Sequence, residues 1–308
     1  MDAQNLPDYD ALMRNEGLGM NFSWGVFGSD DELGTISLLT AERVREAARE
    51  VQRGRVFNLC LPLNQPPPRG RRSPYRHTVF NIDRNTQDDV VDNLYMQAST
   101  QWDALRHVRA REHGFYNGVS AEDAAKADGR LGIDRWAEHG MVGRGVLVDV
   151  VNHLEQHHHR TLSPDEGFWI TPEVIEEVLD AQACTLREGD FLLLRTGYIR
   201  SIIDPSGERP TSWPGLAPRE AMARYIWNKH VAAVVADNPA VETAPGDPKE
   251  FLHRRLIPML GVALGEFFNF EDLARDCQED RRFTCLFMAA PLNLPGGVGS
   301  PGNGIAVK

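Results

Sequence analysis

Asp103 and His107 lie four residues apart in the segment QASTQWDALRH. On a helical turn this spacing puts the carboxylate and the imidazole on one face. Such a pair can bind a divalent cation, or the imidazole can act as a base that the carboxylate orients. The same spacing also arises by chance in surface ion pairs, so the pair alone identifies no site.

His253 and Glu266 form a second candidate pair. His253 falls in a predicted helix, and Glu266 ends an apolar stretch that is typical of a strand. A carboxylate in that position is either exposed at the strand end or buried with a cationic partner, because an unpaired buried charge is costly. The sequence leaves both readings open.

Other polar clusters are less specific. The segment NHLEQHHHR resembles a solvated loop, although one of its imidazoles could reach a substrate; its histidines are His153, His157, His158 and His159. An arginine-rich loop could clamp a substrate carboxylate or be a soluble flap; its arginines are Arg69, Arg71, Arg72 and Arg76. The cysteines have no CxxC spacing, so we expect buried free thiols; they are Cys60, Cys184, Cys277 and Cys285.

Composition excludes several classes of protein. The 308 residues carry a net charge of -11, which disfavours nucleic acid and anionic membranes as partners. No apolar run approaches the ~18 residues of a membrane span. The first ten residues, MDAQNLPDYD, lack the order of a signal peptide, and we expect a cytoplasmic protein. We find no P-loop, GxGxxG or GxSxG motif, which argues against nucleotide binding and serine hydrolysis.

Helical and strand-like segments alternate along the chain, which predicts a mixed α/β or α+β fold in one domain. Thr171 and Pro172 have the residue types that begin a helix. We expect a loop at 65–77 and a turn-rich tail at 294–307, which contains five glycines. The other predicted helices are 40–53, 218–229, 248–258 and 270–277. The predicted strands are 56–63, 91–99, 144–151, 191–197, 230–237, 259–266 and 282–292.

Six ordered motifs resemble the putative cyclase family of metal-dependent hydrolases, which includes kynurenine formamidase and isatin hydrolase. The segment from Gln97 to His107 is similar to the family motif H-x-G-T-H-x-D-x-x-x-H. The other five are RGVLVDV, EGDFLLLRTGY, WPGL, FLHRRLIPMLGVALGEFFNFEDL and APLNLPGGVGSPGNGIAV. The resemblance covers about residues 50–308. It implies a swivelling β/β/α-type domain over 1–308, with residues 1–50 as an N-terminal extension and helix packed on it.

The resemblance also implies roles for single residues. Asp103, His253 and Glu266 correspond to metal ligands, and His107 corresponds to the catalytic histidine. Gln97 and Gln101 stand where the family motif has its two leading histidines. Because an amide oxygen is a poorer zinc ligand than imidazole, the first metal position is expected to be empty or altered. Gln101 or His107 could complete the remaining oxygen-rich set, which suits Mn²⁺ or Mg²⁺ at least as well as Zn²⁺.

The favoured hypothesis is a hydrolase in which metal-activated water opens a small cyclic or aryl amide, imide or lactone. Trp102, Trp24 and Gln97 are candidate substrate contacts, although a core role for the two tryptophans is about as plausible. The alternatives are a metal-free small-molecule binding protein on the same fold, and a lyase or cyclase. Related proteins assemble, so the resemblance implies a homodimer or homotetramer.

Overall fold

A central β-sheet organises the computed structural model, which describes residues 6–68, 70–126, 129–203, 210–246 and 250–308. Within these residues the sheet has nine strands in the order β14-β6-β12-β11-β9-β7-β13-β15-β3. Their bounds are β3 (Val56–Asn58), β6 (Gln101–Asp103), β7 (Met141–Asp149), β9 (Phe191–Arg195), β11 (Ala233–Ala236), β12 (Ala263–Glu266), β13 (Thr284–Ala289), β14 (Gly299–Pro301) and β15 (Gly304–Val307).

The middle of this sheet is parallel and deeply buried. Strands β7, β9, β11 and β12 run parallel to one another, whereas the flanking strands pair antiparallel. Every residue of β9, β11 and β12 is buried. Near-continuous apolar runs such as FLLL and AVVA are typical of parallel strands covered on both faces. The mixed α/β and α+β fold expected from the sequence is confirmed.

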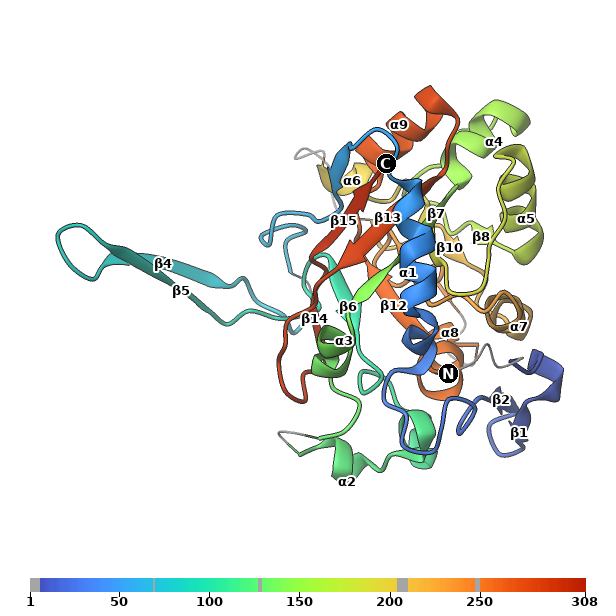
Figure 1. Cartoon of the computed structure of the whole chain (residues 1–308), viewed down its shortest axis with the longest axis horizontal. Helices are drawn as coiled ribbons and strands as arrows, with labels where there is room; N and C mark the ends of the chain where they lie inside the picture. The colour runs from blue at the N-terminus through green and yellow to red at the C-terminus, as the bar shows by residue number, and fades with distance from the viewer. Residues whose placement is uncertain (1–5, 69, 127–128, 204–209, 247–249) are drawn as a thin grey trace.

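Helices pack around the sheet (Figure 1), and at least one helix lies in the connection between each two consecutive parallel strands. Helix α5 begins at Pro172, as predicted. The helices are α1 (Ala41–Ala47), α2 (Ala121–Ala124), α3 (Ile133–His139), α4 (Val150–His158), α5 (Pro172–Ala181), α6 (Arg200–Ile203), α7 (Glu220–Asn228), α8 (Leu252–Arg254) and α9 (Glu271–Asp280); a π-helical turn, η6 (Arg255–Met259), follows α8. In the described part of the chain, no helix combines the length and the apolar composition that crossing a bilayer requires.

The N-terminal segment is tied to the body by specific hydrogen bonds. The Tyr9 amide donates to Asn228 Oδ1 at 2.7 Å, and Thr35 Oγ1 donates to the Ala232 carbonyl at 2.7 Å. A small hairpin of β1 (Met13–Asn15) and β2 (Met20–Phe22) lies beside η6. These contacts agree with an extension packed on the main body, and the division at residue 50 stays a prediction.

A long hairpin projects from the body and is the most exposed part of the fold (Figure 1). It consists of β4 (Arg76–Asn81) and β5 (Gln87–Asp92), paired antiparallel. Five apolar side chains of this hairpin and its turn are exposed to solvent: Val79, Phe80, Ile82, Val90 and Val91. We call this hairpin the arm. The sequence predicted no strand over 78–90: the predicted loop at 65–77 overlaps the first two residues of β4, and the predicted strand at 91–99 overlaps the last two residues of β5.

Two further sequence predictions are wrong in detail. The tail at 294–307 is not only turns, because β14 and β15 lie within it and extend the sheet on both sides. The strand predicted at 56–63 is only β3, after which the chain passes through turns toward the proline-rich loop. The glycines of the tail are required for packing: a Cβ on Gly304 would lie 2.5 Å from the Phe268 ring.

A buried ion-pair network joins the carboxyl ends of β7 and β9 to α9. Arg195 is 2% exposed; its Nη1 donates to Asp149 Oδ1 at 2.7 Å and its Nε donates to Glu271 Oε1 at 2.8 Å. Burial lowers the pKa of Arg195, but the charges of Asp149 and Glu271 outweigh burial and raise it. Asp149 also caps α4 by accepting a hydrogen bond from the Asn152 amide. The network therefore fixes where α4 and α9 begin.

We predict that Arg195→Ala lowers the free energy of unfolding by about 3–5 kcal/mol, because it leaves Asp149 buried without its cation. Arg200→Ala is the matched control. Arg200 donates to the same Glu271 at 2.9 Å from an exposed position, so its loss should cost less than about 1 kcal/mol. Denaturant unfolding of the two variants measures both values. Equal losses would show that burial of the pair does not matter.

Candidate metal centre

The register between β6 and β12 brings together residues that are far apart in the sequence. Gln101 pairs with Glu266, and Asp103 pairs with Leu264. Side chains alternate between the two faces of a strand, so Gln101, Asp103 and Glu266 share one face. Gln101 Nε2 donates to Glu266 Oε2 at 2.5 Å. Glu266 is the last residue of a parallel strand, and the cluster therefore lies at the carboxyl edge of the sheet, where α/β proteins often bind ligands.

His253 enters this cluster from α8 and is held by two carboxylates. Its Nδ1 donates to Glu242 Oε1 at 3.0 Å, and its Nε2 lies 3.0 Å from Glu266 Oε1 and 3.9 Å from Asp103 Oδ2. Glu242 also accepts a hydrogen bond from the Leu252 amide at 2.5 Å, which ties it to the start of α8. A carboxylate that accepts a hydrogen bond from Nδ1 orients the ring so that Nε2 is free to face a metal ion. This arrangement is common among metal-bound histidines.

Negative charge dominates the cluster. Asp103, Glu242, Glu266 and His253 are each 6% exposed or less. Burial and the charge of Glu266 raise the pKa of Asp103 to about 6. Burial lowers the pKa of His253, but hydrogen bonds to Glu242 and Glu266 outweigh it and hold this pKa well above its usual range. The site therefore favours cations over neutral groups.

Two buried oxygens in the cluster lack hydrogen-bond partners among the described residues: Gln101 Oε1 and Asp103 Oδ1. Buried acceptors are rarely left unpaired, because each one costs the free energy of its lost hydration. Asp103, His253 and Glu266 each offer a ligand atom, and these atoms all lie within 4.8 Å of one another. The donor set and its unpaired oxygens fit a divalent cation with oxygen and imidazole ligands.

His107 lies at the rim of this group. Its Nε2 is 3.6 Å from Asp103 Oδ2, and its side chain is 28% exposed. The pair is not helical: Asp103 ends β6, and a turn in which the His107 amide donates to the Ala104 carbonyl returns the imidazole to the carboxylate. Burial lowers the pKa of His107. A partly exposed imidazole beside the buried carboxylates can exchange protons with solvent.

The three candidate substrate contacts lie in different surroundings. Trp102 points to the opposite face of β6, is fully buried, and packs edge-on against Phe268. This placement favours the core role that the sequence left open for Trp102, and its contact with substrate stays a prediction. Trp24 packs on Phe22 and donates to the Pro258 carbonyl, and nothing tests its contact with substrate. Gln97 directs its amide toward Gly299, which pairs with Asp103, so its role at the site stays a prediction.

Strained backbone surrounds the two glutamates. Val241 and Phe267, which neighbour Glu242 and Glu266, have φ values of 56° each. Bulky residues seldom adopt this left-handed conformation, and such strain concentrates at functional sites. A hydrogen bond from the Phe267 amide to the Asn238 carbonyl, at 3.1 Å, holds Phe267 in this strained conformation. Glu242 was not predicted from the sequence, because it lies outside the predicted helices and strands and in none of the motifs.

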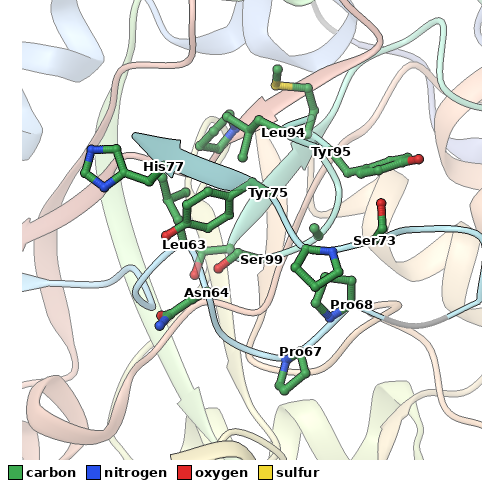
Figure 2. Close-up of a pocket in the computed structure, with 15 residues that line it drawn as sticks. Leu63, Asn64, Pro67, Pro68, Ser73, Tyr75, His77, Leu94, Tyr95 and Ser99 are labelled. Carbon is green, nitrogen blue, oxygen red and sulfur yellow. The ribbon is translucent and has the colours of Figure 1, made fainter. Parts of the chain in front are cut away.

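A cavity of about 360 Å³ lies at the base of the arm and not among the carboxylates. Figure 2 shows that Tyr75, Tyr95, Leu63 and Leu94 surround it, together with prolines of the 65–77 loop. Pro301 of the tail also lines it. None of the clustered carboxylates or His253 lines this cavity. We therefore treat the cavity as a separate surface feature.

Two of the remaining sequence predictions can be judged. The histidine-rich segment is not a solvated loop: its first three histidines lie on α4, and His153 is buried. All four cysteines are free, as expected, but only Cys277 and Cys285 are buried, whereas Cys60 and Cys184 are partly exposed. In the arginine-rich loop, Arg72 donates to the Gln97 carbonyl and Arg76 pairs with Asp92. These contacts do not decide between the two hypotheses for this loop, a clamp for a substrate carboxylate and a soluble flap. Arg71 is exposed, and Arg69 lies outside the described residues.

Comparison with known proteins identifies relatives of this chain. A family model described as Putative cyclase matches residues 58–243, more than half of the sequence. No curated protein sequence is similar enough to count as a relative. A crystal structure described as a novel cyclase is 36% identical and has a TM-score of 0.81. The match covers 93% of this chain and 99% of that chain.

More distant solved structures share the fold. Isatin hydrolase A from Labrenzia aggregata, bound to benzyl benzoate, is 19% identical with a TM-score of 0.59, over 82% of this chain and 93% of that one. An isatin hydrolase bound to the product analogue thioisatinate is 16% identical with a TM-score of 0.58, over 87% and 98%. The family match and the 36% identical structure show that this chain belongs to the cyclase family.

Proposed function

We propose that the protein is a metal-dependent hydrolase that cleaves a small cyclic or aryl amide, imide or lactone. The observation that carries this proposal is the buried group of Asp103, His253 and Glu266 with two unpaired oxygens beside it. A site with this much buried negative charge is costly unless a cation neutralises it. The names of the isatin hydrolases, which have the same fold, support the choice of a cyclic amide.

In this mechanism Asp103, His253 and Glu266 would hold a divalent ion, and Gln101 Oε1 could add a neutral ligand. When bound, such an ion would make water nucleophilic at neutral pH by lowering its pKa. Glu242 keeps the His253 ring oriented with Nε2 toward the other ligands. His107 accepts a proton at Nε2 and passes it to the leaving nitrogen or oxygen. Three oxygen ligands and one imidazole favour Mn²⁺ at least as well as Zn²⁺.

We predict a graded loss of metal across three variants. Asp103→Asn should abolish binding, because it removes an anionic ligand and leaves no replacement. Glu242→Gln should weaken binding by about 10–100-fold, the usual cost of losing a group that orients a ligand. Gln97→Ala should have the smallest effect. Equilibrium dialysis against Mn²⁺, followed by elemental analysis, measures all three affinities.

The order of these effects decides the assignment. Loss of metal in Gln97→Ala with full binding in Asp103→Asn would contradict it. Metal-free protein that binds an aryl amide without cleaving it would favour the small-molecule binding alternative. A lyase or cyclase would be recognised by a product that has not gained the mass of water.

His107→Ala should keep its metal and lose turnover by about 10²–10⁴-fold, as expected when a general acid–base group is removed. The reason is geometric: the three-residue ligand set is within 4.8 Å without His107. Metal content and hydrolysis of a cyclic amide are measured on the same preparation. An ion-free His107→Ala protein would instead make His107 a ligand.

We also propose that the chain forms a homodimer or homotetramer through its arm. A two-stranded ribbon is marginally stable in water by itself, and this one exposes apolar side chains on both faces. The cavity at its base is lined by prolines of the 65–77 loop and by Pro301 of the tail. Such a surface is typical of one that a second copy covers.

Phe80→Asp should shift the sedimentation mass toward the 34.5 kDa of one chain, because it puts a charge among the exposed apolar side chains of the arm. Arg84→Ala, in the turn of the same hairpin, is the control and should keep the assembled mass. Sedimentation at micromolar protein gives both values. A wild-type mass of 34.5 kDa would rule out the assembly.

A further inference from the structure

His153 on α4 is a buried histidine whose two ring nitrogens both lack a hydrogen-bond partner among the described residues. Its side chain is 7% exposed. A neutral imidazole has one N–H donor and one acceptor, and burying both without partners is costly. Buried polar groups left unpaired in this way call for an explanation such as an ion or a water molecule.

Two potential metal ligands lie beside this ring. His158 is in the last turn of α4, and Glu177 comes from α5 (Figure 1). Glu177 Oε2 is 3.8 Å from His153 Nε2 and 3.8 Å from His158 Nε2. These separations are too long for hydrogen bonds. Ligands of a tetrahedral zinc ion, with bonds of about 2.0–2.2 Å, lie roughly 3.3–3.6 Å apart, so small side-chain movements would suffice.

We propose that His153, His158 and Glu177 form a second metal site, which binds Zn²⁺ or a similar imidazole-preferring cation. Two imidazoles and one carboxylate are a ligand set that zinc uses, with water in the fourth position. His158 and Glu177 are about half exposed, so an ion and its water can reach the site from solvent. Burial lowers the pKa of His153, which keeps the ring neutral and able to coordinate.

This site is independent of the proposed hydrolytic centre. Helix α4 follows β7, whereas Asp103 is on β6, and β12, β11 and β9 lie between these two strands in the sheet. An ion here would link α4 to α5. Asp149, the partner of Arg195, is the N-cap of α4, so the link would stabilise the helices around the buried network. We assign it a structural role.

The test is a zinc titration of the full-length protein after metal removal by a chelator. His158→Ala and Glu177→Gln change exposed side chains and should fold normally, which circular dichroism checks. Each should bind one zinc ion fewer per chain than the wild type and lose the zinc-induced rise in Tm that this ion provides. His159→Asn is the matched control: His159 is the left-handed C-cap of α4, a conformation that asparagine tolerates.

Two results would overturn the proposal. One is equal zinc stoichiometry and affinity in the wild type, His158→Ala and Glu177→Gln. The other is loss of the ion in His157→Ala but not in His158→Ala. His157 is the alternative ligand because its ring centroid lies 5.0 Å from that of His153. Because the measurement is a difference between wild type and variant, it holds whether or not Asp103 and Glu266 bind metal. Asp103→Asn tests that centre separately.

Discussion

The buried negative charge at the carboxyl edge of the sheet is the constraint on which the site depends. Asp103, Glu242 and Glu266 surround His253, and burial makes each charge expensive unless an opposite charge is near. The chain brings them together despite the cost, and it uses left-handed backbone at Val241 and Phe267 to do so. Strain and buried charge at one place indicate that function, and not stability, determines this arrangement.

The short strand β6 serves the core and the site at once. Trp102 fills the space beside Gly265, where a Cβ would lie 3.1 Å from its ring, while Gln101 and Asp103 point to the other face. A slip of one residue in the pairing with β12 would reverse the two faces and bury both polar side chains in the core. Packing of the tryptophan therefore fixes the position of the aspartate.

The sequence predicted those elements in which consecutive residues are apolar and buried. The apolar runs of β9 and β11 predicted buried strands because both faces of those strands are covered. The arm has little such pattern, since its strands are exposed on both faces. Asp103, His253 and Glu266 were predicted as metal ligands from the ordered motifs, whereas Glu242 joins the cluster through a contact with His253 that no local spacing encodes. The histidines of α4 resembled a loop because polar residues outnumber the buried Val150, Val151 and Leu154.

The two groups of candidate metal ligands differ in chemistry, and this difference separates their roles. The group at the sheet edge combines two carboxylates, one amide and one imidazole, all buried, so it favours hard cations and holds them away from bulk solvent. The group on α4 and α5 combines two imidazoles with one exposed carboxylate, so it favours zinc and leaves it open to water. An ion in the first group neutralises charge that folding has already buried. An ion in the second group would coordinate one nitrogen of a single buried ring, so its contribution would be to the packing of two helices and not to the chemistry at the sheet edge.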